Sequence, residues 1–305
     1  VFKNILNYFN YKFICKIILF SIFLSACFGI IGWILIQFNI ENIFATNYEY
    51  PIAIGKSARA TGLFSTPSML AIHIIICLLI LISFDKKSNK FYYGYKLIFF
   101  ISLFLKLSKS ILIFLAIYLF YLGKKFKIFN KLFITLFIFL IILQNFIVHI
   151  IFINKNNNWL NDSFSPNNVS PIINFFDFQF YFSNYTFLKL KSIEVIKNIF
   201  PNGIGFRNFN KYESLNYSYI DHFNPHSTYL GVLCEYGILG FVSILFFFIF
   251  LLQKSKQYFI KKNIVFFYLI MIYFLIEAIN TDIISFKIFW IMVAIIISNN
   301  QKKYE

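Results

Sequence analysis

The sequence predicts an all-α protein, a polytopic bundle of about eight transmembrane helices with a large outer loop that carries an amphipathic helix. Composition is the first reason. Apolar residues make up 59% of the 305 residues, only 13% are charged, and the mean hydropathy is +0.72. A soluble domain needs a charged surface that this composition cannot supply. We therefore expect an integral membrane protein.

The second reason is the length of the apolar stretches. A bilayer core about 30 Å thick needs roughly 20 apolar residues per helix. The chain has stretches of about this kind at 13–37, 68–84, 92–107, 110–123, 131–153, 228–252, 264–280 and 283–298. Because the chain begins with Val1 rather than Met, we expect this count to be a minimum.

Charge sets the expected orientation. The net charge is +16, but the lysines fall in short segments between apolar stretches rather than on a soluble face. This placement argues against a nucleic-acid partner and follows the positive-inside rule. The lysine-rich segments are then cytoplasmic, and the long loops 38–67 and 154–227 face outward.

The chain accordingly divides into three parts. Residues 1–153 hold the N-terminal transmembrane helices with the outer loop 38–67, and residues 228–305 hold the C-terminal ones. Between them, residues 154–227 form an outer loop long enough for a subdomain. Within that loop an apolar helical face predicts an amphipathic helix near the membrane surface. That face comprises Leu190, Ile193, Ile196 and Phe200.

The arginines indicate an anion site. Only two of the 28 basic residues are arginine, Arg59 and Arg207, and both lie in outer loops beside glycine-containing motifs. A guanidinium group binds phosphate or carboxylate through two parallel hydrogen bonds, which an ammonium group cannot do. The polar hinge with Lys106, Ser108 and Lys109 lies on the same side. Lys109 either joins this site or extends toward the lipid headgroups.

Histidine supplies the candidate base. His226 follows Pro225 and precedes Ser227 and Thr228, a pattern typical of a helix start. A neutral imidazole there can take a proton from a substrate hydroxyl. His222 and His226 are four apart, but the intervening proline disfavours a shared helical face. We predict no metal site.

We expect Glu235 to be structural, paired with another helix.

Four motifs occur in order. They are "RATGLFSTPSMLA", the hinge "LSKS", "IEVIKNIFPNGIGFRNF" and "PHSTYLGVLCEYGILGF". Together they resemble the O-antigen ligase and O-antigen polymerase superfamily, over about residues 55–300. The last motif resembles that family's proline–histidine–asparagine and glutamate–x–glycine signature, and the third its periplasmic helix followed by glycine–x–glycine.

The resemblance implies a GT-C-like glycosyltransferase of the bacterial inner membrane, with its active site and the large loop 154–227 on the periplasmic face. Such enzymes pass a glycan from an undecaprenyl-diphosphate carrier to an acceptor sugar hydroxyl, on lipid A core or on growing polysaccharide, without metal or other cofactor. It assigns the diphosphate to Arg59 and Arg207 and activation of the acceptor to His226. Residues implied as structural near the site are Pro225, Gly203, Gly205 and Glu235.

The chain departs from the family pattern in three places. Lys109 stands where the hinge arginine is usual, and Ser227 replaces the asparagine after His226. The arginine early in the periplasmic helix has no equivalent, which leaves Lys189 and Lys191 as candidate substitutes. Ligase and polymerase both remain open. A non-catalytic flippase of the same lipid-linked sugar is the alternative, although transporters usually show internal repeats and charges at mid-membrane.

Overall fold

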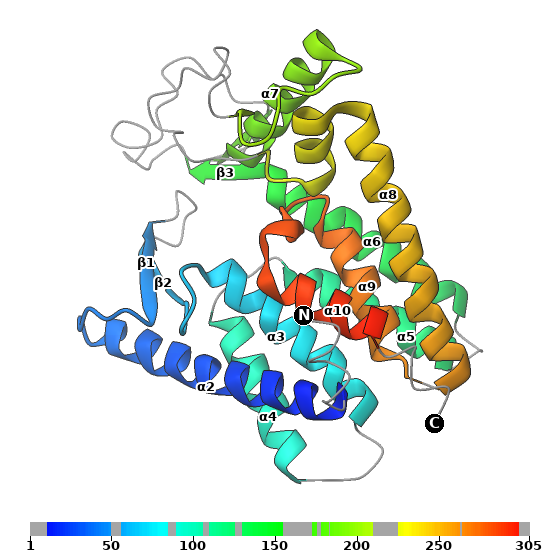
Figure 1. Ribbon diagram of the computed structural model, residues 1–305. Helices are drawn as coiled ribbons and strands as arrows, with labels where there is room; N and C mark the ends of the chain where they lie inside the picture. The colour runs from blue at the N-terminus through cyan, green and yellow to red at the C-terminus, as the bar shows by residue number, and fades with distance from the viewer. Residues whose placement is uncertain are drawn as a thin grey trace.

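The computed structural model describes residues 11–49, 56–84, 90–105, 110–125, 130–154, 173–175, 178–182, 184–209, 225–262 and 264–298. Within these residues the chain is mostly helical (Figure 1). The α-helices are α2 (Tyr11–Gln37), α3 (Pro67–Phe84), α4 (Lys90–Phe104), α5 (Ser110–Lys125), α6 (Asn130–His149), α7 (Asn184–Ile199), α8 (Thr228–Lys262), α9 (Phe266–Glu277) and α10 (Lys287–Ser298).

Each predicted apolar stretch contains a helix. Among the described residues, two helices are long and apolar enough to cross a membrane, Tyr11–Gln37 and Thr228–Ile260. The other six are shorter, with apolar segments of 10–17 residues. The structure thus agrees with a helical membrane protein, while the number of spans stays a prediction. The helix expected over 131–153 ends at His149, and that part of the prediction is wrong.

Short strands qualify the all-α prediction. The strands are β1 (Ala45–Glu49), β2 (Lys56–Ala60), β3 (Ile150–Asn154), β4 (Ile173–Phe175) and β5 (Phe178–Phe182). β1 and β2 form an antiparallel pair, and the second sheet has the antiparallel order β3-β5-β4. β1 and β2 lie within the predicted outer loop 38–67 and β4 and β5 within 154–227, whereas β3 takes the end of the predicted span 131–153. The second sheet is rich in aromatic and β-branched residues, which favour strands over helix.

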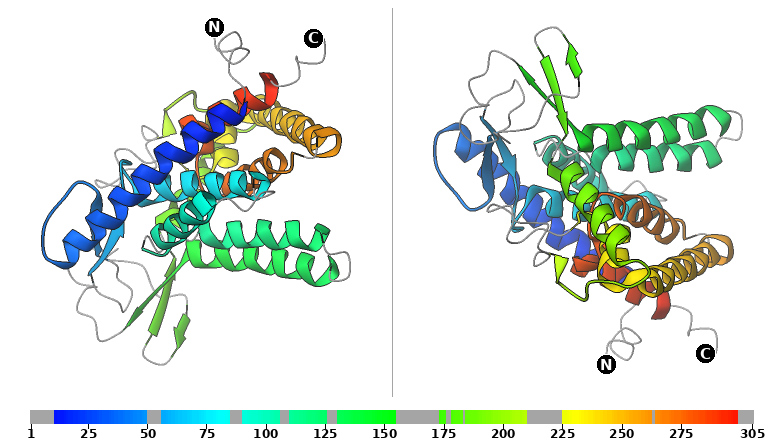
Figure 2. Two further views of the ribbon diagram at one scale, coloured as in Figure 1. Left: turned by 90° about the horizontal axis from the view of Figure 1, so that it is seen from below. Right: turned by 90° about the horizontal axis from the view of Figure 1, so that it is seen from above.

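α3 forms the centre of the bundle. Its residues from Leu70 to Leu81, apart from His73, are at most 3% exposed. A helix that is apolar on every face is stable only when neighbours surround it, and α2, α4, α5 and α9 all pack against α3. Figure 2 shows α5 and α6 side by side, with α2 crossing the bundle.

The "RATG" motif joins the β1–β2 hairpin to α2. Gly62 has φ +59, and a Cβ there would collide with the Ser25 carbonyl oxygen. The next amide, of Leu63, donates to the Ser25 hydroxyl at 2.9 Å. Only glycine combines this positive φ with so close an approach. The motif's glycine therefore sets how the hairpin that carries Arg59 sits on α2.

Candidate functional site

The start of α8 is anchored on the turn that follows α9. The Thr228 backbone amide donates to the Ala278 carbonyl at 2.9 Å, and its hydroxyl donates to the Thr281 carbonyl at 3.0 Å. The Ser227 hydroxyl also lies 3.3 Å from the Ala278 carbonyl. Both side chains are buried, at 3% and 1% exposure. The serine that replaces the family's asparagine is thus part of this anchor.

His226 is held in an unusual backbone conformation just before that anchor. Its φ is +46, in the left-handed region that residues other than glycine rarely adopt. Burial, helped by the nearby positive charge of Lys189, lowers the pKa of His226 to about 4. The imidazole is therefore neutral at pH 7 and can accept a proton. This is the protonation state that a general base requires.

Lys189, on α7, provides the cation beside this histidine. Its ammonium nitrogen donates to Asn280 Oδ1 at 2.6 Å, across 91 residues of sequence. Burial lowers the pKa of Lys189 to about 8, so most of the population is still charged at pH 7. The Asn280 amide in turn donates to Gln144 Oε1 at 3.1 Å and to Asn145 Oδ1 at 2.9 Å on α6. Four segments of the chain meet here.

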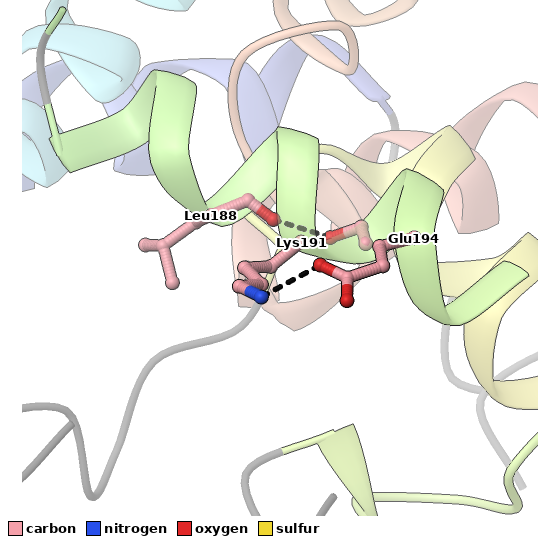
Figure 3. Close-up of polar contacts among 4 residues, drawn as sticks. Leu188, Lys191 and Glu194 are labelled. Atoms are coloured by element: carbon pink, nitrogen blue, oxygen red, sulfur yellow. Dashed lines mark hydrogen bonds and ion pairs between the residues drawn. The ribbon is translucent and has the colours of Figure 1, made fainter. Parts of the chain in front are cut away.

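Lys191 lies differently, although the sequence offers it as an equal candidate. Its ammonium pairs with Glu194 Oε2 at 2.6 Å (Figure 3). On the same helix the Ser192 hydroxyl donates to the Leu188 carbonyl at 2.6 Å. Leu188, Ser192 and Val195 form the buried face, whereas Leu190 and Ile193 are 51% and 39% exposed. Of the two lysines, Lys189 is the one next to His226.

The segment after α7 packs into a kink of α8. Gly237 has φ 66 and ψ −161, which interrupts the helix. The amides of Ile204 and Gly205 donate to the carbonyls of Cys234 and Glu235 at 3.0 and 2.9 Å, and the Ile238 amide donates to the Pro201 carbonyl at 3.0 Å. The kink leaves the Cys234 and Glu235 carbonyls and the Ile238 amide without partners inside α8, and the segment after α7 supplies their hydrogen bonds.

Glycine is required at this contact. A Cβ at Gly203 would collide with the Glu235 carbonyl oxygen, and one at Gly237 would collide with the Pro201 carbonyl oxygen. Gly205, at φ +89, adopts a conformation that favours glycine. The glycine–x–glycine motif therefore fixes α7, with its lysine, against α8.

The structure places the two arginines on different elements. Arg207, with φ +56, is exposed, and its guanidinium carbon lies 5.0 Å from the Phe206 ring centroid. Its backbone amide is hydrogen-bonded to the Glu235 carboxyl group. Arg59 pairs with Thr46 in the β1–β2 hairpin, which Figure 1 shows on the opposite side of the molecule from the kink in α8. A shared diphosphate site for both arginines stays a prediction.

The hinge candidates Lys106, Ser108 and Lys109, and also His222, lie outside the described residues. The next residue, Ser110, begins α5, and its hydroxyl donates to Glu277 Oε1 at 3.2 Å. The Thr281 hydroxyl donates to the same oxygen at 3.1 Å.

Sequence reasoning missed Glu277 and Asn280. Glu277 is 4% exposed, and its Oε2 atom has no hydrogen-bond partner among the described residues. The available signal was "FLIEAIN", a carboxyl group inside an apolar helix, where charge is costly and usually functional.

Within the described part of the chain, no group of three or more His, Cys, Asp or Glu side chains lies close enough to hold a metal ion. The polar residues of the site are instead a neutral imidazole, a buried ammonium group and carboxamides. Such groups suit a hydroxyl nucleophile and an anionic ligand.

These features define a class, an integral membrane protein of packed apolar helices with a polar site where α6, α7, α8 and the α9 turn meet. The family model described as O-antigen ligase matches residues 94–245, which include α7 and His226. The chain belongs to the O-antigen ligase and polymerase superfamily, and the resemblance that the motifs indicated is confirmed. Neither the curated proteins nor the solved structures gave a match.

Proposed function

We propose that this protein is a glycosyltransferase that takes a glycan from an undecaprenyl-diphosphate carrier and passes it to an acceptor sugar hydroxyl on the periplasmic face. The observation that supports this most strongly is a neutral His226 near enough to the cationic Lys189 for that charge to help lower its pKa, inside the region that matches the family. A base and a cation at one place are what a hydroxyl nucleophile and a diphosphate leaving group need.

In the proposed reaction His226 removes the proton from the acceptor hydroxyl, and the oxygen of that hydroxyl attacks the anomeric carbon of the donor sugar. The bond between that carbon and the phosphate oxygen breaks, and undecaprenyl diphosphate leaves with the bonding electron pair. Arg207, Arg59 and Lys189 are the candidates to hold the diphosphate, since cationic side chains stabilise the charge that develops on it. Lys106, Ser108 and Lys109 stay candidates from the hinge.

We expect this chemistry to proceed without a divalent metal, because the cationic side chains can neutralise the diphosphate themselves. Purified protein treated with EDTA should keep its transfer rate. Loss of transfer with EDTA, restored by magnesium or manganese, would contradict the expectation.

A flippase of the same lipid-linked sugar is the second candidate. Glu277, a carboxyl group buried within an apolar helix, is the feature that favours it, because charges at membrane depth often line transport pathways. The two functions differ in products. A transferase releases undecaprenyl diphosphate in detergent with donor and acceptor present, whereas a flippase leaves the donor intact and only moves it across vesicles.

Deletion of the gene tests the proposal in cells and separates its two forms. The surface polysaccharide is run on a gel before and after deletion. Loss of all capped lipopolysaccharide, with free polymer retained, indicates a ligase, and a band with a single repeat indicates a polymerase. An unchanged ladder in the deletion strain would overturn the proposed transferase.

A further inference from the structure

Three carboxamide side chains near Lys189 have no role in the proposed reaction. They belong to Asn280, Gln144 and Asn145. Asn280 and Gln144 are 8% and 2% exposed. Burying an amide without hydrogen bonds is costly, because the group gives up its bonds to water. Polar groups kept in such a place therefore need partners, and here each partner is another element of the site.

The hydrogen bonds fix which end of Asn280 faces the lysine. The Asn145 amide donates to the Ile141 carbonyl of its own helix at 2.9 Å, which turns the Asn145 oxygen toward Asn280. Both acceptors on α6, Gln144 Oε1 and Asn145 Oδ1, then receive bonds from Asn280 Nδ2. With its nitrogen committed to α6, Asn280 presents its oxygen to the ammonium group of Lys189.

The neutrality of these groups is important for the chemistry. A carboxylate at this place would pair with Lys189 and cancel its charge, whereas a carboxamide oxygen accepts a hydrogen bond and leaves the net positive charge in place. That charge already acts on His226, whose pKa it helps to lower. The ammonium group is thus oriented but still available to an anionic ligand.

We infer that Asn280, oriented by Gln144 and Asn145, is a positioning residue that fixes the ammonium group of Lys189 beside His226. In this position the ammonium group binds the diphosphate of the donor. The inference rests on the proposed function for the identity of the anion. The contact itself, between α7 and the α9 turn, does not depend on that function.

A double-mutant cycle tests the positioning role. Asn280→Ala should raise the KM for the lipid-linked donor about tenfold or more with a smaller change in kcat, since hydrogen bonds to charged groups are stronger than those between neutral groups. In a Lys189→Met background the same change should alter kcat/KM less than about twofold. Equal losses in both backgrounds would show that Asn280 acts through something other than Lys189.

A second measurement needs no transfer reaction. The purified protein is treated with an amine-reactive reagent over a range of pH, and modification of Lys189 is followed by mass spectrometry. The midpoint should lie near the pKa of about 8 set by burial. The nearly isosteric Asn280→Asp should move it to higher pH, because a carboxylate favours the charged amine. An unchanged midpoint would overturn the inference.

The control is Asn42→Ala, which removes a carboxamide that is bonded to the Gly32 carbonyl at 2.9 Å in the outer loop after α2. It should leave the Lys189 midpoint unchanged. Ionisable groups on the elements around the lysine stay the same in every variant, namely His226, Glu235, Glu277 and Asp282. If the wild-type protein transfers no glycan while Asn280→Asp still moves the midpoint, the proposed function fails and the contact stands.

Discussion

At the scale of residues, the pKa values of His226 and Lys189 predict a bell-shaped pH profile for transfer. His226 is a base only when neutral, and its pKa is about 4. Lys189 holds an anion only when charged, and its pKa is about 8. We expect kcat/KM to rise near pH 4 and to fall near pH 8.

Lys189→Arg checks the assignment of the alkaline side of this profile. A guanidinium group keeps its charge to pH values above 12, so the fall near pH 8 should disappear in this variant. The same fall in wild type and variant would mean that another group titrates there.

The free energy of unfolding should also depend on pH through His226. Because the folded pKa of His226 lies below its ordinary value of 6.5, the free energy of unfolding should decrease as the pH falls from about 6.5 toward about 4.

Single residues also show the limit of sequence reasoning. His226 could be selected because Pro225 and the following hydroxyl residues mark a helix start. The contact between Lys189 and Asn280 spans 91 residues, and no local pattern predicts it. Both lysines of α7 are equivalent in the sequence, and only the packing of Leu188, Ser192 and Val195 against α8 decides which one meets the histidine.

At the scale of elements, the docking of the segment after α7 into the α8 kink should be sensitive to a single methyl group. Gly203→Ala places a Cβ against the Glu235 carbonyl oxygen, and overpacking of this kind costs typically about 1–3 kcal/mol. The variant should show a lower Tm in detergent than the wild type.

Gly231→Ala is the matched control. Gly231 lies on α8, before the kink at Gly237. An added Cβ there meets nothing closer than the Pro225 ring at 3.9 Å. Alanine also favours helix over glycine by roughly 0.5–1 kcal/mol, so the Tm should stay the same or rise. Equal losses from both substitutions would show that the contact at Gly203 is not special.

The elements differ in how well the sequence predicts them. Long apolar runs predict α2 and α3 because a bilayer or a core leaves no alternative to helix. The kink in α8 was not predictable, since Gly237 is one of several glycines in the chain and a single helix over 228–252 fits the hydropathy equally well. β5, with the sequence FQFYF, was not predictable for a similar reason, because an aromatic loop segment of this composition forms either strand or irregular chain.

At the scale of the whole molecule, the proposed location of the site on the periplasmic face depends on the orientation of the chain in the membrane. From the lysine-rich segments we expect the end of α8 to lie in the cytoplasm and α7 to lie outside. A cysteine introduced at the exposed Lys197 on α7 should react with a membrane-impermeant maleimide in intact cells. One introduced at the exposed Lys256, near the end of α8, should react only after permeabilisation. The reverse pattern would invert the topology and put the site on the wrong side for a periplasmic acceptor.

The most direct test of the proposed reaction is glycan transfer by His226→Ala at equal membrane abundance, with lipid-linked donor and acceptor supplied. A positioned base contributes typically about 10²–10⁴-fold. The variant should therefore lose at least about 10²-fold in transfer while it still binds the donor, because the cations that hold the diphosphate are unchanged. Transfer at the wild-type rate would contradict the base assignment and leave His226 as part of the helix start alone.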